Sequence, residues 1–203
     1  MALIQKIYQR SSINLLLFGL GLFVLIALNY KEAIYTFGLK ESFTLGFNAF
    51  LLLGAAKVID LGTGLNAQII GTSNYWKFEL TSGIILLGIT LPLTYILVKQ
   101  MGITGPAVAF LISTTIYNSI RIVFLWMKFK LQPFTNATIY TIITAAASYF
   151  LCYFTCKNIH GFAGLFSRSI LFMLLYGSAI VYFNLSPDVK PVWLTIKKRI
   201  GLK

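Results

Sequence analysis

The sequence predicts an all-α membrane protein, a polytopic bundle of six transmembrane helices. Of its 203 residues, 58% are hydrophobic and 11% are charged, whereas a soluble globular protein has about 25% charged residues. The mean hydropathy is +0.81, and apolar runs recur from one end of the chain to the other. This composition excludes a water-soluble enzyme, a disordered chain and a nucleic-acid-binding module.

The apolar runs have the length that a membrane span requires. A helix needs about 20 apolar residues to cross a hydrocarbon core about 30 Å thick. Six segments are long and apolar enough, namely residues 12–29, 43–69, 78–98, 104–126, 137–156 and 165–185. We therefore expect a six-span domain over residues 1–186 and a separate tail over residues 187–203.

The first span follows two basic residues, Lys6 and Arg10. A cleaved signal peptide has an apolar region of about 7 to 15 residues and a cleavage site of small residues. The first span is longer, carries Asn14 and Asn29 near its ends, and is followed by no such site. We therefore expect a signal anchor or an ordinary first span.

Turn-forming residues separate the later spans from one another. Clusters of glycine, proline, serine, asparagine and their polar neighbours end one apolar run before the next begins. These clusters lie at residues 71–74, 102–106, 132–133 and 158–161. Pro106 suits the first turn of span four, because its missing N–H would have no helical partner there.

Spans three to five each carry a local pattern that bears on helix packing. Pro92 in span three is expected to kink or break its helix, as happens in transporter sites and also in inert bundles. Span four begins with small residues at Gly105, Ala109 and Ser113, which favour close helix packing. Cys152 and Cys156 in span five are one helical turn apart, a spacing that gives no disulfide framework.

The charges of the loops predict the orientation of the spans. The chain has 17 Lys and Arg against 5 Asp and Glu, and cytoplasmic loops carry the excess of basic residues. One side holds four basic residues, Lys31, Lys40, Lys99 and Lys157. The other side holds ten, which are Lys6, Arg10, Lys77, Lys128, Lys130, Lys190, Lys197, Lys198, Arg199 and Lys203. Six spans then place both termini in the cytoplasm.

The tail after Ser186-Pro187 differs in kind from the spans. Its apolar residues fall on one helical stripe, and its basic residues lie elsewhere on the helix; the stripe consists of Val189, Val192, Trp193, Ile196 and Ile200. This pattern is typical of an amphipathic helix that lies on the inner leaflet and binds its anionic lipids. The alternative is a frayed basic tail that stops membrane transfer.

Span two carries an ionisable pair, Lys57 and Asp60, on one helical face. Ionisable groups inside spans usually face the interior of a bundle or a water-filled cavity, because exposure to lipid is costly. The pair indicates either a polar binding site near the middle of the membrane or a self-neutralised pair that ties two helices together. The sequence leaves both interpretations open.

Span four carries a polar stripe on an otherwise apolar helix. Thr114, Tyr117, Asn118 and Arg121 recur at helical spacing on one face, so we expect them to line a cavity or to face protein. The guanidinium of Arg121 could bind a phosphate with two hydrogen bonds. Alternatively, Arg121 reaches the headgroups or pairs with Glu79, and either arrangement would weaken a ligand role.

The residue patterns of enzymes are missing from the sequence. His160 is the one histidine, in a predicted outer loop, so no histidine cluster for a metal can form. No Cys–His pair, Gly-x-Ser-x-Gly motif or phosphate-binding loop occurs. We therefore expect no catalysis, no metal and no cofactor.

Five stretches between residues 45 and 135 form a set that is found together in one family. They are residues 60–73 with Tyr75-Trp76-Lys77, Pro92-Leu-Thr-Tyr95, Gly102-Ile-Thr-Gly-Pro-Ala-Val-Ala109, Tyr117-Asn118 with Arg121, and residues 129–134. Together they resemble bacterial polysaccharide flippases, the O-antigen and exopolysaccharide exporters of the multidrug/oligosaccharidyl-lipid/polysaccharide superfamily. Pro106 stands where those proteins commonly have alanine.

The resemblance implies a role in the bacterial inner membrane. Members of this family have twelve to fourteen spans in two lobes around a cavity with alternating access, so this chain would correspond to the C-terminal lobe. It would then be a fragment, a truncated product or a half that pairs with an N-terminal lobe on another chain. The implied substrate is an oligosaccharide on undecaprenyl diphosphate, with Lys57 and Arg121 as candidate ligands of the diphosphate.

Three other functions remain open at this point. A multidrug or small-solute antiporter half would need a carboxylate for cation coupling, for which Asp60 is the mid-span candidate. A membrane-embedded enzyme of glycan assembly would need catalytic residues in sizeable outer loops, whereas the outer loops predicted for this chain are short. A purely structural membrane subunit is the third alternative. The sequence identifies neither the sugar nor the coupling ion.

Overall fold

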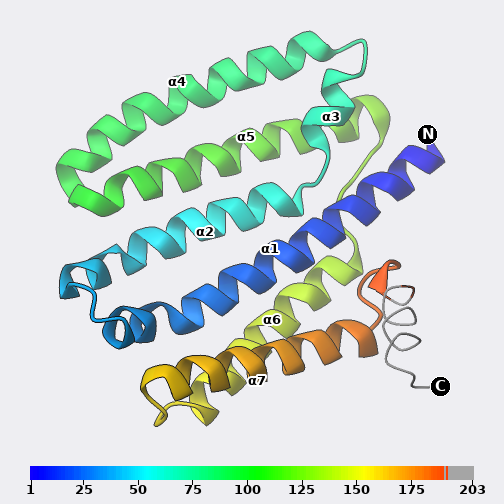
Figure 1. The fold of residues 1–203 in the computed structure, drawn as a ribbon. Helices are drawn as coiled ribbons and strands as arrows, with labels where there is room; N and C mark the ends of the chain where they lie inside the picture. Colours follow the sequence, from blue (N-terminus) through cyan, green and yellow to red (C-terminus); the bar gives the residue numbers. More distant parts are fainter. Residues whose placement is uncertain (190, 192–203) are drawn as a thin grey trace.

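The computed structural model describes residues 1–189 and 191, and this part of the chain forms helices and turns without any β-strand (Figure 1). The predicted all-α fold is therefore confirmed. In chain order the elements are α1 (Ala2–Thr36), η1 (Glu41–Gly46), α2 (Phe47–Gly62), α3 (Asn66–Gly71), α4 (Trp76–Met101), η2 (Gly102–Thr104), α5 (Gly105–Phe129), α6 (Asn136–Thr155) and α7 (Gly161–Tyr182).

Five of the six predicted spans each correspond to one long helix, whereas the second covers the end of η1, all of α2 and the start of α3. Five helical stretches are long and apolar enough to cross a membrane, and one of them, Trp76–Phe129, comprises both α4 and α5. α4 has 26 residues and α5 has 25, so each exceeds the span length by itself. The chain therefore has the architecture of a multi-pass membrane protein.

The second span differs from its predicted extent of residues 43–69, because α2 ends at Gly62 and a short α3 follows. Ser12 on α1 donates a hydrogen bond to the carbonyl of Gly62. Gly64 has a φ of +68°, and a Cβ there would lie 3.0 Å from the Cβ of Ser12. The close approach of α1 thus explains both the helix end and the glycine at this turn.

Two other helices also depart from expectation. α1 has 35 residues, about 52 Å, and so extends well past both ends of a hydrocarbon core about 30 Å thick. α4 continues through Pro92 as a single helix, so the predicted break does not occur. Because Pro92 is exposed on the bundle surface, its ring fits there without displacing a neighbouring helix.

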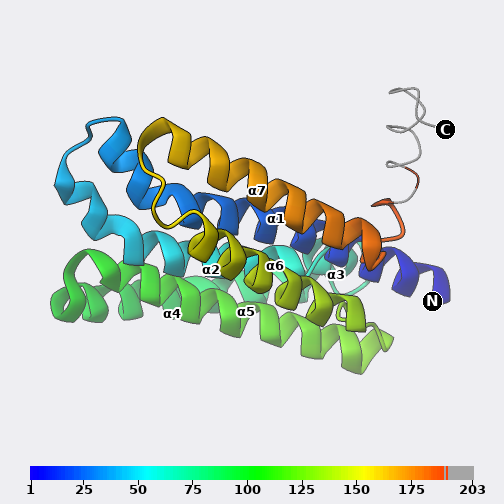
Figure 2. The same cartoon turned by 90° about the horizontal axis from the view of Figure 1, so that it is seen from below.

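The helices form two groups that meet at α1 and α2. α5 packs between α4 and α2 in one group, whereas α1, α6 and α7 pack against one another in the second. Figure 2 shows the two groups from below, with α1 lying against α2. The start of α1 and the end of α7 lie at the same end of the bundle, where Arg10 forms an ion pair with Asp188.

Two buried apolar clusters hold these groups together. The larger one joins α1 to α6 and α7 through side chains that include Leu16, Leu20 and Phe172. The smaller one joins the start of α1 to α3 and the end of α5, and its members are Tyr8, Ile70, Leu125 and Leu131. Many large apolar side chains on the other helix faces are exposed, as expected for surfaces that contact lipid.

Two further sequence predictions concern the cysteines of the fifth span and the C-terminal tail. Cys152 and Cys156 are both buried free thiols. The predicted amphipathic helix rests mainly on Val192, Trp193, Ile196 and Ile200, which lie outside the described residues.

Candidate functional site

The polar stripe of α5 packs against protein. Thr114, Asn118 and Arg121 are buried, and Tyr117 is half-buried. α5 lies between α4 and α2, so each side of the stripe meets a different helix. Two separate polar clusters result, one with α4 and one with α2.

The cluster between α5 and α4 is centred on Arg121 and Glu79. Nη2 of Arg121 lies 2.7 Å and 2.8 Å from the two carboxylate oxygens of Glu79. The hydroxyl of Tyr117 donates to the same carboxylate over 3.3 Å, and the guanidinium carbon lies 4.5 Å from the centre of the Tyr117 ring. Glu79, the alternative partner considered from the sequence, thus neutralises Arg121 in this arrangement.

The cluster between α5 and α2 is centred on Asn118 and Asp60. The amide of Asn118 donates to Asp60 over 3.2 Å, and the hydroxyl of Thr63 donates to Asn118 over 3.1 Å. Asn118 also donates to the backbone carbonyl of Thr114 over 3.2 Å. Nζ of Lys57 lies 3.6 Å from the other carboxylate oxygen of Asp60.

The two clusters differ in their exposure. The side chain of Arg121 is 5% exposed and that of Glu79 is 25% exposed, whereas Lys57 is 66% exposed and Asp60 is 40% exposed. The pair on α2 therefore lies on the surface of the bundle, in the middle of the second predicted span. It is connected to the interior through Asp60 and Asn118.

A third polar cluster lies near the C-terminal end of α1 and was not predicted from the sequence. Glu32 accepts hydrogen bonds from Nη1 of Arg168 over 3.2 Å and from the backbone N–H of Gly161 over 2.6 Å. His160, from the predicted outer loop, lies with its Nδ1 3.4 Å from Glu32. Because Glu32 and Arg168 are 136 residues apart, no local spacing could have indicated their pairing.

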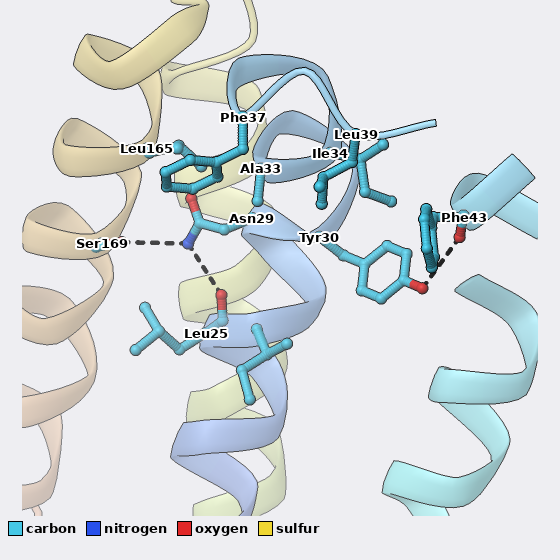
Figure 3. A pocket seen from close by; sticks show the side chains of 11 residues that line it. Leu25, Asn29, Tyr30, Ala33, Ile34, Phe37, Leu39, Phe43, Leu165 and Ser169 are labelled. Atoms are coloured by element: carbon cyan, nitrogen blue, oxygen red, sulfur yellow. Dashed lines mark hydrogen bonds between the residues drawn. The ribbon is translucent and has the colours of Figure 1, made fainter. Parts of the chain in front are cut away.

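Two mainly apolar hollows lie at opposite ends of α1. Figure 3 shows the larger one, about 490 Å³, between the end of α1, the loop after it and α7. There the amide of Asn29 donates to the carbonyl of Leu25 over 2.9 Å and to Ser169 over 3.2 Å. The other, about 390 Å³, lies between the start of α1, α3 and the end of α5. Neither lining contains a charged side chain.

Within the described part of the chain, no group of three or more His, Cys, Asp or Glu residues could hold a metal ion. Comparison of the whole sequence and fold with protein-family models, curated proteins and solved structures gives no match.

Proposed function

We propose that this chain is the C-terminal, six-span part of a transporter that flips lipid-linked oligosaccharide across the bacterial inner membrane by alternating access. The carrier would be undecaprenyl diphosphate, and the product would serve surface polysaccharide assembly. The missing lobe would come from further spans or from a partner chain. Both termini would lie in the cytoplasm, according to the distribution of loop charges.

The exposed Lys57–Asp60 pair is the observation that carries the proposal. A charged side chain near the centre of a bilayer costs about 2.5 to 3.5 kcal/mol on insertion scales, so such residues usually face protein or water. Lys57 is two-thirds exposed on the described bundle. A second lobe or a hydrated path between lobes would remove this cost, and transporters place their sites between such repeats.

The resemblance of residues 60–73 to polysaccharide flippases supports the same proposal. This stretch begins at Asp60 and includes the end of α2 and all of α3. An ammonium group beside a hydrated path also suits a diphosphate, because lysine binds phosphate as a point charge.

Deletion of the gene in its native host tests the proposed function. We expect loss of surface polysaccharide and accumulation of lipid-linked oligosaccharide in the cytoplasmic leaflet, both restored by a plasmid copy. In an unrelated flippase-deficient strain, the 203 residues alone should not restore export. Normal surface polysaccharide in the deletion strain would contradict the transport function, and restoration by the lone chain would contradict the need for a second lobe.

Variants of the α2 pair test the proposed site in the same assay. Lys57→Ala should reduce export strongly, and Lys57→Ala combined with Asp60→Asn should not recover it, since the ammonium group is missing in both. Lys40→Ala, in an outer loop, serves as the control. Recovery in the double variant would mean that the pair only ties helices together.

Asp60 also supports a second candidate function, half of a small-solute antiporter. Its carboxylate is 40% exposed in a span, as a cation-coupling group must be. In that case Asp60→Asn alone would abolish transport while Lys57→Ala would leave it largely intact.

A further inference from the structure

An apolar groove runs along one side of α1, between α2 and α6. Both helices pack against α1, which forms the floor of the groove. The cavity measures about 320 Å³, and its lining is apolar except for a tyrosine hydroxyl. Representative lining residues are Leu20, Phe23 and Val24 from α1, Leu51 from α2, and Ala145 and Ala146 from α6.

A polar pocket continues the groove at the end of the bundle opposite to the N terminus. It measures about 460 Å³ and shares Ala27, Phe47 and Tyr149 with the groove. The two hollows thus form one amphipathic site, apolar along α1 and polar at its end. We call the polar part the outer pocket, whose charged lining consists of Lys31, Glu32, Lys157 and Arg168, with His160 beside them.

The charges of the outer pocket leave it positive. Glu32 and Arg168 neutralise each other at 3.2 Å. Lys31 and Lys157 form no ion pair within the described residues, and both are exposed. Nζ of Lys31 lies 5.0 Å above the ring of Phe47, at the point where pocket and groove meet. Two ammonium groups are therefore available to an anion.

The length of the site matches one leaflet of a membrane. From Leu20 to Lys31, α1 rises about 16 Å, close to half of a hydrocarbon core about 30 Å thick. Tyr149 and Tyr153 stand at the pocket end, where aromatic residues commonly mark the membrane–water interface. A free phosphate would leave the groove empty, and a long polyisoprenoid chain would extend beyond one leaflet.

We propose that this site binds an anionic glycerophospholipid, with its headgroup phosphate between Lys31 and Lys157 and an acyl chain in the groove. Leu51 and Lys57 are six residues apart and so point about 120° apart around α2. The lipid site therefore lies on a different side of α2 from the pair used in the proposed transport function. It does not depend on that function.

Native mass spectrometry of the purified full chain tests the headgroup contact. Phosphatidylglycerol and phosphatidylcholine with identical acyl chains are titrated against the detergent-solubilised protein. We expect one retained phosphatidylglycerol and clearly weaker retention of phosphatidylcholine. Lys31→Gln with Lys157→Gln should weaken phosphatidylglycerol binding roughly 25-fold, since each basic group near anionic lipid contributes about fivefold. Lys40→Gln with Lys99→Gln removes the same charge elsewhere and should change little.

A second pair of variants tests the groove. Ala146→Trp fills it, whereas Ala147→Trp places the same ring on the neighbouring exposed position, which does not line it. We expect Ala146→Trp to weaken retention of both lipids and Ala147→Trp to leave it unchanged. Equal binding of the two lipids, equal losses in both lysine pairs, or unchanged retention in Ala146→Trp would each overturn the proposal.

Discussion

Arg121 and Lys57 are both basic residues inside spans, but their surroundings assign them different roles. Arg121 is buried, forms an ion pair with Glu79 and lies over the ring of Tyr117. Lys57 is exposed, and its contact with Asp60 is longer, at 3.6 Å. A substrate could reach Lys57 without displacing a neighbour, whereas it would have to separate the Arg121–Glu79 pair first. We therefore regard Lys57 as the better candidate ligand.

The Arg121–Glu79 pair should stabilise the α4–α5 hairpin. Arg121→Ala leaves Glu79 charged and without its main partner, and breaking a buried pair costs about 3 to 5 kcal/mol. Because Glu79 is a quarter exposed, we expect a loss near the lower end. Arg121→Met with Glu79→Gln should recover most of it. Thermal unfolding in detergent measures both variants, and a single variant as stable as the wild type would show that the pair contributes nothing.

At the scale of elements, close packing of α4 and α5 depends on a glycine at the turn between them. A Cβ on Gly105 would lie 2.4 Å from the backbone carbonyl oxygen of Leu97, which cannot move without bending α4. Ala109 and Ser113 follow at helical spacing and are fully buried. The ridge of small residues predicted from the sequence therefore lies in packed regions of the bundle.

Gly105→Ala should destabilise the hairpin by about 1 to 3 kcal/mol, as overpacking does elsewhere. Gly88→Ala is the matched control, because a Cβ at Gly88 meets nothing within 4 Å. That substitution should leave stability unchanged or raise it slightly, since alanine favours a helix. Melting temperatures in the same detergent compare the two, and similar values would argue against close contact at Gly105.

The sequence predicted the number of long helices because span length depends on composition alone. It could not predict where α2 ends, since the stop depends on Ser12, 50 residues earlier. The periodicity of α5 placed Thr114, Asn118 and Arg121 on one face, and all three are buried. Their partners on α2 and α4 follow from the packing of helices, which no local pattern encodes. The outer pocket was missed for the same reason, since its residues come from separate helices.

For the whole molecule, six crossings place both ends of the described chain on one side of the bundle. The contact of Arg10 with Asp188 agrees with this even number. The same arrangement puts the loops after α1, α4 and α6 together at the opposite end (Figure 1).

Cysteine labelling of intact cells tests the predicted orientation. After Cys152 and Cys156 are replaced, single cysteines at Lys40, Lys99 and Lys157 should react with an impermeant thiol reagent. Cysteines at Lys77 and Lys130 should react only after the membrane is opened. Labelling at Lys130 in intact cells would contradict the predicted orientation. The side with ten basic residues would then face the outside and the side with four would face the cytoplasm, against the usual distribution.

The central position of α1 has a consequence for the synthesis of the protein. Asn29 bonds to Ser169, and Asn14 bonds to Ser186, so both partners are translated long after α1. At about 5 to 20 residues per second, Asn29 waits roughly 7 to 28 s for Ser169 to leave the ribosome. For most of that interval α1, the most buried of the long helices described, has neither α6 nor α7 beside it. Translation order therefore leaves the protein's central helix partly uncovered until its last two helices have been made.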